Sequence, residues 1–66
     1  MNLKERMQLD IGDQVFWADP DENLCSGYCK IVDIITPSKR VENLSSVLIL
    51  ENDMGGIAEA YVCEVA

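Results

Sequence analysis

Asp19, Asp21 and Asn23 alternate along a short acidic segment, with the spacing that opens a calcium-binding loop. An EF-hand loop also needs a glycine at its sixth position and a bidentate glutamate at its twelfth. Counted from Asp19, those positions hold Leu24 and Lys30, so neither requirement is met. A looser oxygen site that includes the neighbouring Glu is an alternative, but we predict an acidic, solvated turn without a metal.

The cysteines Cys25, Cys29 and Cys63 could hold zinc only with help, because the chain has no histidine. A structural zinc site needs four ligands, so a carboxylate or a second chain would have to complete it. Their odd number also argues against a complete set of intrachain disulfides. We expect Cys29 and Cys63 to be small core or half-buried residues and Cys25 to be exposed, with no metal or cofactor.

Catalytic chemistry finds little support in the residue types. Nucleophilic catalysis needs a base beside the nucleophile, and histidine, the usual base, is absent. Lys30 follows Cys29, but neighbours along a strand point to opposite faces of the sheet. Nothing in the sequence places a carboxylate in an apolar pocket, where it could serve as a general acid or base. We therefore predict no catalytic residues and no enzymatic activity.

The aromatic side chains point more specifically to a surface that binds a partner. Trp17 is predicted to be a core anchor, whereas Phe16 has the opposite orientation along the same strand. With Tyr28 or Tyr61 beside it, Phe16 could form an exposed apolar patch that binds a protein partner or a second copy. Nearby acidic residues would steer a basic partner towards this patch. The predicted partner-binding residues are Phe16, Asp19, Asp21, Glu22, Tyr28 and Tyr61.

Length and charge narrow the class of protein. The chain has 66 residues, and twelve acidic against five basic residues give a formal net charge of −7. A hydrophobic content of 48% suffices for one small core in a single domain. The basic residues are scattered, whereas nucleic-acid binding needs clustered Lys and Arg, so we predict no direct nucleic-acid contact.

The longest strongly apolar run, Val47–Leu50, is far below the ~20 residues that span a bilayer, and no apolar signal segment follows the first residue. We expect a cytoplasmic protein without a membrane segment.

Turn signals divide the chain into short segments rich in β-branched and aromatic residues, which is typical of an all-β domain. The strongest turn is Asn52–Gly56, where paired glycines permit positive φ. We treat residues 1–9 as an N-terminal arm, either a frayed tail or one helical turn, and residues 10–66 as the domain. The expected strands are Gln14–Ala18, Tyr28–Thr36, Ser45–Glu51 and Ile57–Cys63, with a short fifth strand or a 3₁₀ turn at Glu64–Ala66.

The second expected strand does not alternate cleanly, because Ile31, Val32, Ile34 and Ile35 crowd its centre. Burial of both faces or a β-bulge would explain this pattern. The predicted core consists of Val15, Trp17, Ile31, Ile34, Val47, Ile49, Ile57, Ala60, Val62 and Val65.

Several segments resemble those of Tudor-like and other SH3-like barrels. The pattern Gly-Asp-x-Val-x-Trp at 12–17 resembles their first strand, and the apolar stretch after a glycine at 27–34 resembles their second. Residues 52–60 resemble their third turn and fourth strand, and 63–65 lie where such barrels close with a 3₁₀ turn. The resemblance implies a small, five-stranded, partly open SH3-like barrel. Tudor-like barrels use three or four aromatics to bind methylated Lys or Arg, but the third turn here contains none.

More narrowly, Asp-Pro-Asp at 19–21 and Ser-Gly-Tyr at 26–28 resemble a group of short bacterial proteins with an SH3-like barrel. The resemblance covers residues 11–65, and the group has no established activity to transfer.

We predict a non-catalytic protein-interaction module or accessory protein with a protein partner that is basic. The alternative is an acidic decoy of nucleic acid that occupies a nucleic-acid-binding protein. Direct nucleic-acid binding would regain support only if Lys30, Lys39 and Arg40 converged beside an aromatic. A homodimer is left open, because the unpaired edges of an open barrel can accept a second chain or an extended peptide.

Overall fold

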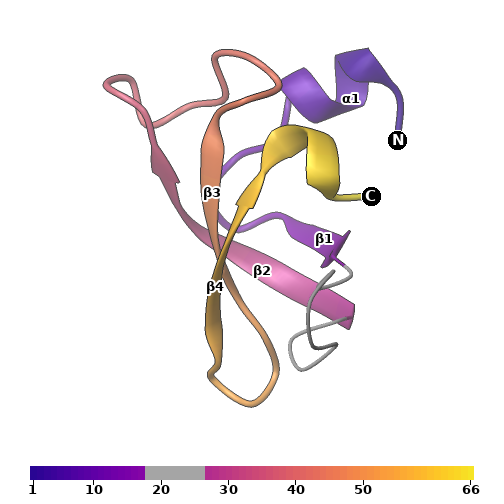
Figure 1. Cartoon of the computed structure of the whole chain (residues 1–66), viewed down its shortest axis with the longest axis vertical. Coiled ribbons are helices and arrows are strands. Elements are labelled where there is room, and N and C mark those ends of the chain that lie inside the picture. The colour runs from indigo at the N-terminus through magenta and orange to yellow at the C-terminus, as the bar shows by residue number, and fades with distance from the viewer. Residues whose placement is uncertain (18–26) are drawn as a thin grey trace.

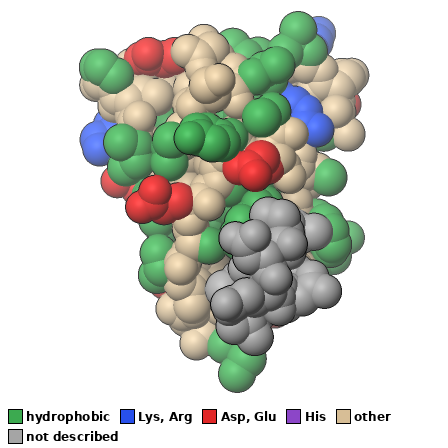
Figure 2. All heavy atoms as spheres, in the orientation of Figure 1, with side chains coloured by type: hydrophobic (Ala, Val, Ile, Leu, Met, Phe, Trp, Pro, Cys, Tyr) green, Lys and Arg blue, Asp and Glu red, His purple; other side chains and the backbone are tan. Residues whose placement is uncertain are grey.

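The computed structural model describes residues 1–17 and 27–66, and the remaining residues are drawn in grey in Figures 1 and 2. The described strands form one antiparallel sheet in the order β1-β2-β3-β4, so each strand pairs with its neighbour in the sequence. The mostly β class is therefore confirmed. The elements are α1 (Leu3–Met7), β1 (Gln14–Trp17), β2 (Gly27–Ile35), β3 (Val47–Glu51), β4 (Ile57–Tyr61) and the 3₁₀ helix η1 (Val62–Glu64).

The first residues form a helical turn, one of the two alternatives that the sequence left open. The Asn2 side chain accepts a hydrogen bond from the Glu5 N–H at 2.8 Å, which caps the start of α1. Arg6 donates from its guanidinium to the backbone oxygens of Val62, at 2.8 Å, and of Val65. Leu9, which follows α1, is buried in the core. Figure 1 shows the result: α1 and η1 lie at the same end of the molecule, close to both chain termini.

A β-bulge explains the irregular pattern of β2. Ile31 pairs with Leu50 and Asp33 pairs with Ile49, so Val32 is the extra residue between the two pairs. The bulge allows Ile31 and, three residues later, Ile34 to be fully buried on the same face. Of the two explanations that the sequence offered, the bulge is the correct one.

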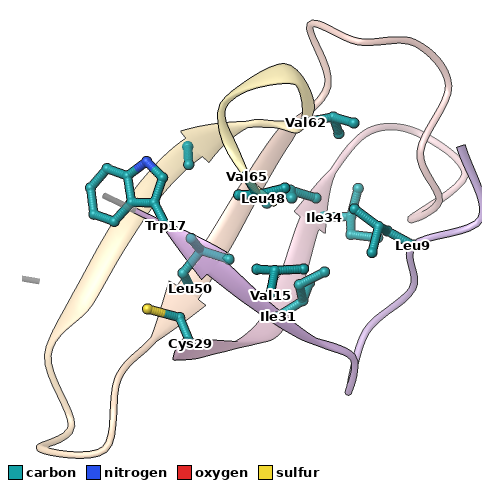
Figure 3. Close-up of a cluster of buried hydrophobic side chains, with 11 residues drawn as sticks. Leu9, Val15, Trp17, Cys29, Ile31, Ile34, Leu48, Leu50, Val62 and Val65 are labelled. Atoms are coloured by element: carbon teal, nitrogen blue, oxygen red, sulfur yellow. The ribbon is translucent and has the colours of Figure 1, made fainter. Parts of the chain in front are cut away.

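The core lies on the inner face of the sheet, with Trp17 and Leu9 at its opposite ends (Figure 3). Every inward position that was predicted on β1 and β2 is confirmed, but the predicted face of β3 is wrong. Leu48 and Leu50 are buried, and Val47 and Ile49 lie half-buried on the outer face. The buried cluster is Leu9, Val15, Trp17, Cys29, Ile31, Ile34, Leu48, Leu50, Ala60, Val62 and Val65.

The register of β3 and β4 follows from the turn that joins them. The Asn52 N–H donates to the Gly56 oxygen at 2.9 Å, and the Asn52 side chain accepts the Gly56 N–H at 2.8 Å. Gly55 has φ +82°, a conformation that L side chains rarely adopt. This turn places Leu48 opposite Ala60 on the buried face and Ile57 opposite Glu51 on the outer face. The prediction that Ile57 is a core residue is therefore wrong, since 58% of its surface is exposed.

The expectation of five strands is also wrong for the described residues, which contain four strands in an open sheet that does not close into a barrel. Instead of a fifth strand, η1 follows β4 directly, and Val65 then forms a single antiparallel bridge with Trp17. Two backbone hydrogen bonds of 2.8 Å join Phe16 and Ala66 reciprocally. Together with Arg6, this bridge holds the C-terminal residues against β1.

Candidate functional site

Phe16 and Tyr28 form an exposed aromatic pair on the outer face of β1 and β2. Their ring centroids are 5.5 Å apart and the ring planes meet at 75°, an edge-to-face contact. Phe16 is 40% exposed and Tyr28 is 64% exposed. The sequence predicted both residues as candidates, and the structure places them in direct contact.

The strand register explains why the two rings meet. Phe16 lies directly opposite Tyr28, and both backbone hydrogen bonds of Phe16 go to Ala66 on the other side of β1. Phe16 and Tyr28 are therefore a non-hydrogen-bonded pair, the antiparallel arrangement in which opposite side chains approach most closely. The C-terminal bridge and the aromatic contact thus depend on the same residue of β1.

A hollow of about 440 Å³ adjoins the pair on this outer face. Tyr28 and Lys30 of β2 form part of its wall, together with Glu51 at the end of β3. Gln14 lies opposite Lys30, and Lys30 lies opposite Glu51, so a polar row of mixed charge crosses three strands. We call Phe16, Tyr28 and this hollow the Phe16–Tyr28 surface. Its remaining lining residues are Gly12, Asn52 and Asp53.

Tyr61, the third aromatic candidate, lies elsewhere. It pairs with Val47, which in turn pairs with Ile35 at the far end of β2 from Tyr28. The path along β2 from Tyr28 to Ile35 is roughly 23 Å at ~3.3 Å per residue. Among the described residues, the aromatic contact is confined to Phe16 and Tyr28. The sequence therefore found three exposed aromatics, but the fold divides them between two surfaces.

Tyr61 belongs to a smaller hollow of about 180 Å³. This hollow is lined by Val47, Glu59, Ala60, Tyr61 and Glu64. The Glu64 carboxylate accepts the Tyr61 N–H at 2.8 Å, so η1 folds this carboxylate back onto the end of β4. The sequence analysis did not identify Glu59 or Glu64 as site residues. A sequence signal was present, however, because no Lys or Arg follows Arg40 in the chain.

The predicted acidic residues Asp19, Asp21 and Glu22 lie outside the described residues, and so does Cys25. Along the chain they belong to the connection between β1 and β2, the two strands that carry Phe16 and Tyr28.

Of the remaining sequence predictions, some are confirmed and one is wrong. Trp17 is buried, as expected of a core anchor, and so is Cys29. Cys63 was expected in the core or half-buried, but it is exposed, because η1 turns it away from the buried Val62. Within residues 1–17 and 27–66, no three Cys, Asp or Glu side chains are grouped so that they could hold a metal ion.

The basic residues do not gather on one face. Lys30 lies on the outer face beside Tyr28, whereas Lys39 and Arg40 lie in the connection after β2. Lys39 forms an ion pair with Asp33 at 3.5 Å, and Arg40 forms one with Asp10 at 3.7 Å. The only helices in the described part of the chain are short, and none could cross a membrane.

Comparison with known proteins adds no further information about the site. No family model, no curated protein and no solved structure matches the chain.

Proposed function

We propose that this chain is a non-catalytic protein-interaction module whose Phe16–Tyr28 surface binds another protein. The observation that carries this proposal is the exposed edge-to-face pair of Phe16 and Tyr28 beside a hollow of about 440 Å³. Aromatic side chains that are held in place before binding contribute large contact areas at a low entropic cost. They are also the residue types that dominate the energy of many protein interfaces.

The partner's chemistry follows from the surroundings of the pair. An apolar side chain would insert beside Phe16 and Tyr28, while polar groups would meet Lys30 and Glu51 at the hollow. The acidic residues at 19, 21 and 22 belong to the connection between the same two strands, and the net charge of −7 favours a basic partner. The odd number of cysteines fits a reducing compartment, and the cytoplasm is the proposed setting.

We also propose that the chain is an open variant of the SH3-like domains that its sequence resembles. Three features support this relation: the sequential strand order, the bulge in β2, and the 3₁₀ helix between β4 and the residue that bridges β1. An experimental structure in which β4 separates β1 from β2 would contradict the proposal.

The test compares matched variants in protein capture from cell lysate, followed by quantitative mass spectrometry. Phe16→Ala and Tyr28→Ala each remove one ring of the pair, and Tyr28→Phe keeps the ring. Ile35→Ala removes an exposed apolar side chain at the far end of β2 from Tyr28 and serves as the control. All variants must first show the wild-type fluorescence of Trp17, which is buried in the core.

We expect at least one protein that both ring-removing variants lose by about tenfold and that Tyr28→Phe and Ile35→Ala retain, since a central interface aromatic contributes ~1–2 kcal/mol or more. If no captured protein follows this pattern, the proposed surface is wrong. A nucleic-acid-binding protein that is lost only when Asp19, Asp21 and Glu22 are changed to amides would instead identify an acidic decoy.

A further inference from the structure

The outer edge of β4 presents unpaired backbone groups. At one end of β4 the Val62 N–H donates to the Ser46 oxygen, and at the other end the Gly56 oxygen accepts the Asn52 N–H. Gly56 and Val62 therefore direct their backbone groups towards β3. Hydrogen-bonding direction alternates along an antiparallel strand, so Ile57, Glu59 and Tyr61 turn their backbone groups away from β3. Within the described part of the chain, only the Tyr61 N–H among these groups has a partner, the Glu64 carboxylate.

The hollow of about 180 Å³ lies beside this edge. Tyr61, half of whose surface is exposed, is one of the residues that line it. Two acidic residues, Glu59 and Glu64, and the apolar Val47 also line the hollow. A lining with an aromatic residue, two acidic residues and an apolar residue fits a long basic side chain, because its methylene groups need apolar contact and its charge needs acceptors.

Charge complementarity selects the same kind of occupant. After Arg40 the sequence contains acidic residues and no basic ones, and the ion pairs of the described residues involve neither Glu59 nor Glu64. Figure 2 shows acidic side chains next to apolar ones on the face where β4 and η1 lie in front. An incoming cationic segment would therefore meet no Lys or Arg from the residues after Arg40. Arg6 contacts η1, but its guanidinium donates to the Val62 and Val65 oxygens and forms no ion pair with Glu59 or Glu64.

We propose that an extended, basic segment of a partner protein adds to β4 as a further antiparallel or parallel strand. Its backbone bonds the free groups of Ile57 and Glu59, and one Lys or Arg side chain occupies the hollow between Glu59, Tyr61 and Glu64. Backbone pairing of this kind provides affinity, and the pocket for alternate side chains provides specificity. This site is separate from the Phe16–Tyr28 surface.

A second copy of the chain fits this edge poorly. In a symmetric antiparallel pairing about the centre of β4, Glu59 would face Glu59 of the second copy, and like charges directly opposite each other destabilise a strand pair. The net charge of −7 on each copy adds repulsion.

The test uses a fluorescein-labelled peptide with the sequence Val-Lys-Val-Lys-Val-Lys-Val and measures fluorescence anisotropy. A second peptide replaces each Val with Pro, which keeps the charge but fixes φ at about −65° at every second residue, far from the φ of a β-strand. The protein variant Glu59→Gln/Glu64→Gln removes both carboxylates and leaves an oxygen that can still accept the Tyr61 N–H. The variant Asp13→Asn/Glu42→Gln makes the same change in net charge at residues that do not line the hollow.

We expect saturable binding of the first peptide and none of the proline peptide. Binding should weaken about fivefold to tenfold in Glu59→Gln/Glu64→Gln and less than twofold in the charge-matched control, given the modest strength of exposed ion pairs and cation–π contacts. On peptide binding, amide chemical shifts should change mainly at Ile57–Glu64. The Phe16→Ala variant should bind the peptide as tightly as wild type, so this test is independent of the proposal for the Phe16–Tyr28 surface.

Three results would overturn the inference: no saturable binding, equal binding of both peptides, or equal weakening by the two double variants. Sedimentation of the protein alone provides a further check. A dimer that becomes tighter in Glu59→Gln would mean that a second copy, and not a basic segment, occupies the β4 edge.

Discussion

Leu48 and Ile49 are adjacent in β3 but lie on opposite faces of the sheet, which allows a direct test of the register. Leu48 has no exposed surface, and it lies opposite Ile34 on one side and Ala60 on the other. Truncation of a buried Leu to Ala costs ~2–5 kcal/mol, because the lost apolar contact is joined by the cost of a cavity. Ile49 is half-buried on the outer face, where no cavity forms, so Ile49→Ala should cost ~1 kcal/mol.

These free-energy differences are large relative to the total unfolding free energy of the domain. A domain of this length has an unfolding free energy of ~3–10 kcal/mol at typical values per residue. With a urea m-value of ~1 kcal/mol/M, Leu48→Ala should lower the unfolding midpoint by ~2 M or more, and Ile49→Ala by ~1 M. The milder pair Leu48→Val and Ile49→Val keeps the comparison measurable if Leu48→Ala does not fold.

The assay is urea unfolding followed by the fluorescence of Trp17, the one tryptophan of the chain. An unchanged m-value would show that the variants differ in stability and not in the extent of unfolding. If Ile49→Ala proved at least as destabilising as Leu48→Ala, the observed register would be refuted, and the face that the sequence predicted for β3 would be the buried one.

Two further predictions concern the chain ends and the thiols. Arg6→Gln should lower the unfolding free energy in urea by ~1–3 kcal/mol, because it removes charged hydrogen bonds to the carbonyls of η1 and the C-terminal residues, whereas Lys4→Gln at the exposed neighbouring position should change it by less than ~0.5 kcal/mol. In a Cys25→Ser background, a thiol reagent should modify Cys63 within the native protein and Cys29 only as the protein unfolds; equal rates would contradict the observed burial.

The aromatic candidates show which properties of a site can be inferred from residue types and strand alternation alone. Phe16, Tyr28 and Tyr61 were all identified as exposed, and alternation along a strand suffices for that inference. Alternation cannot say which strands become neighbours at which register. The pairing of Phe16 with Tyr28, and of Tyr61 with Val47, therefore emerged only from the sheet.

The sequence by itself determined the β class, the approximate position of each strand and the turn at 52–56, because β-branched segments, Gly, Pro and Asn act locally on the backbone. It also determined the inward positions of Val15 and Trp17, because alternation along a strand places these two residues on one face and Phe16 on the other. Only the tertiary structure decided which face of β3 is buried, because four consecutive apolar residues satisfy either orientation until β2 and β4 dock on both sides. It likewise decided that Leu9 belongs to the core and that Glu64 folds back onto β4, since these contacts join segments far apart in the chain or depend on a turn that no local pattern specifies.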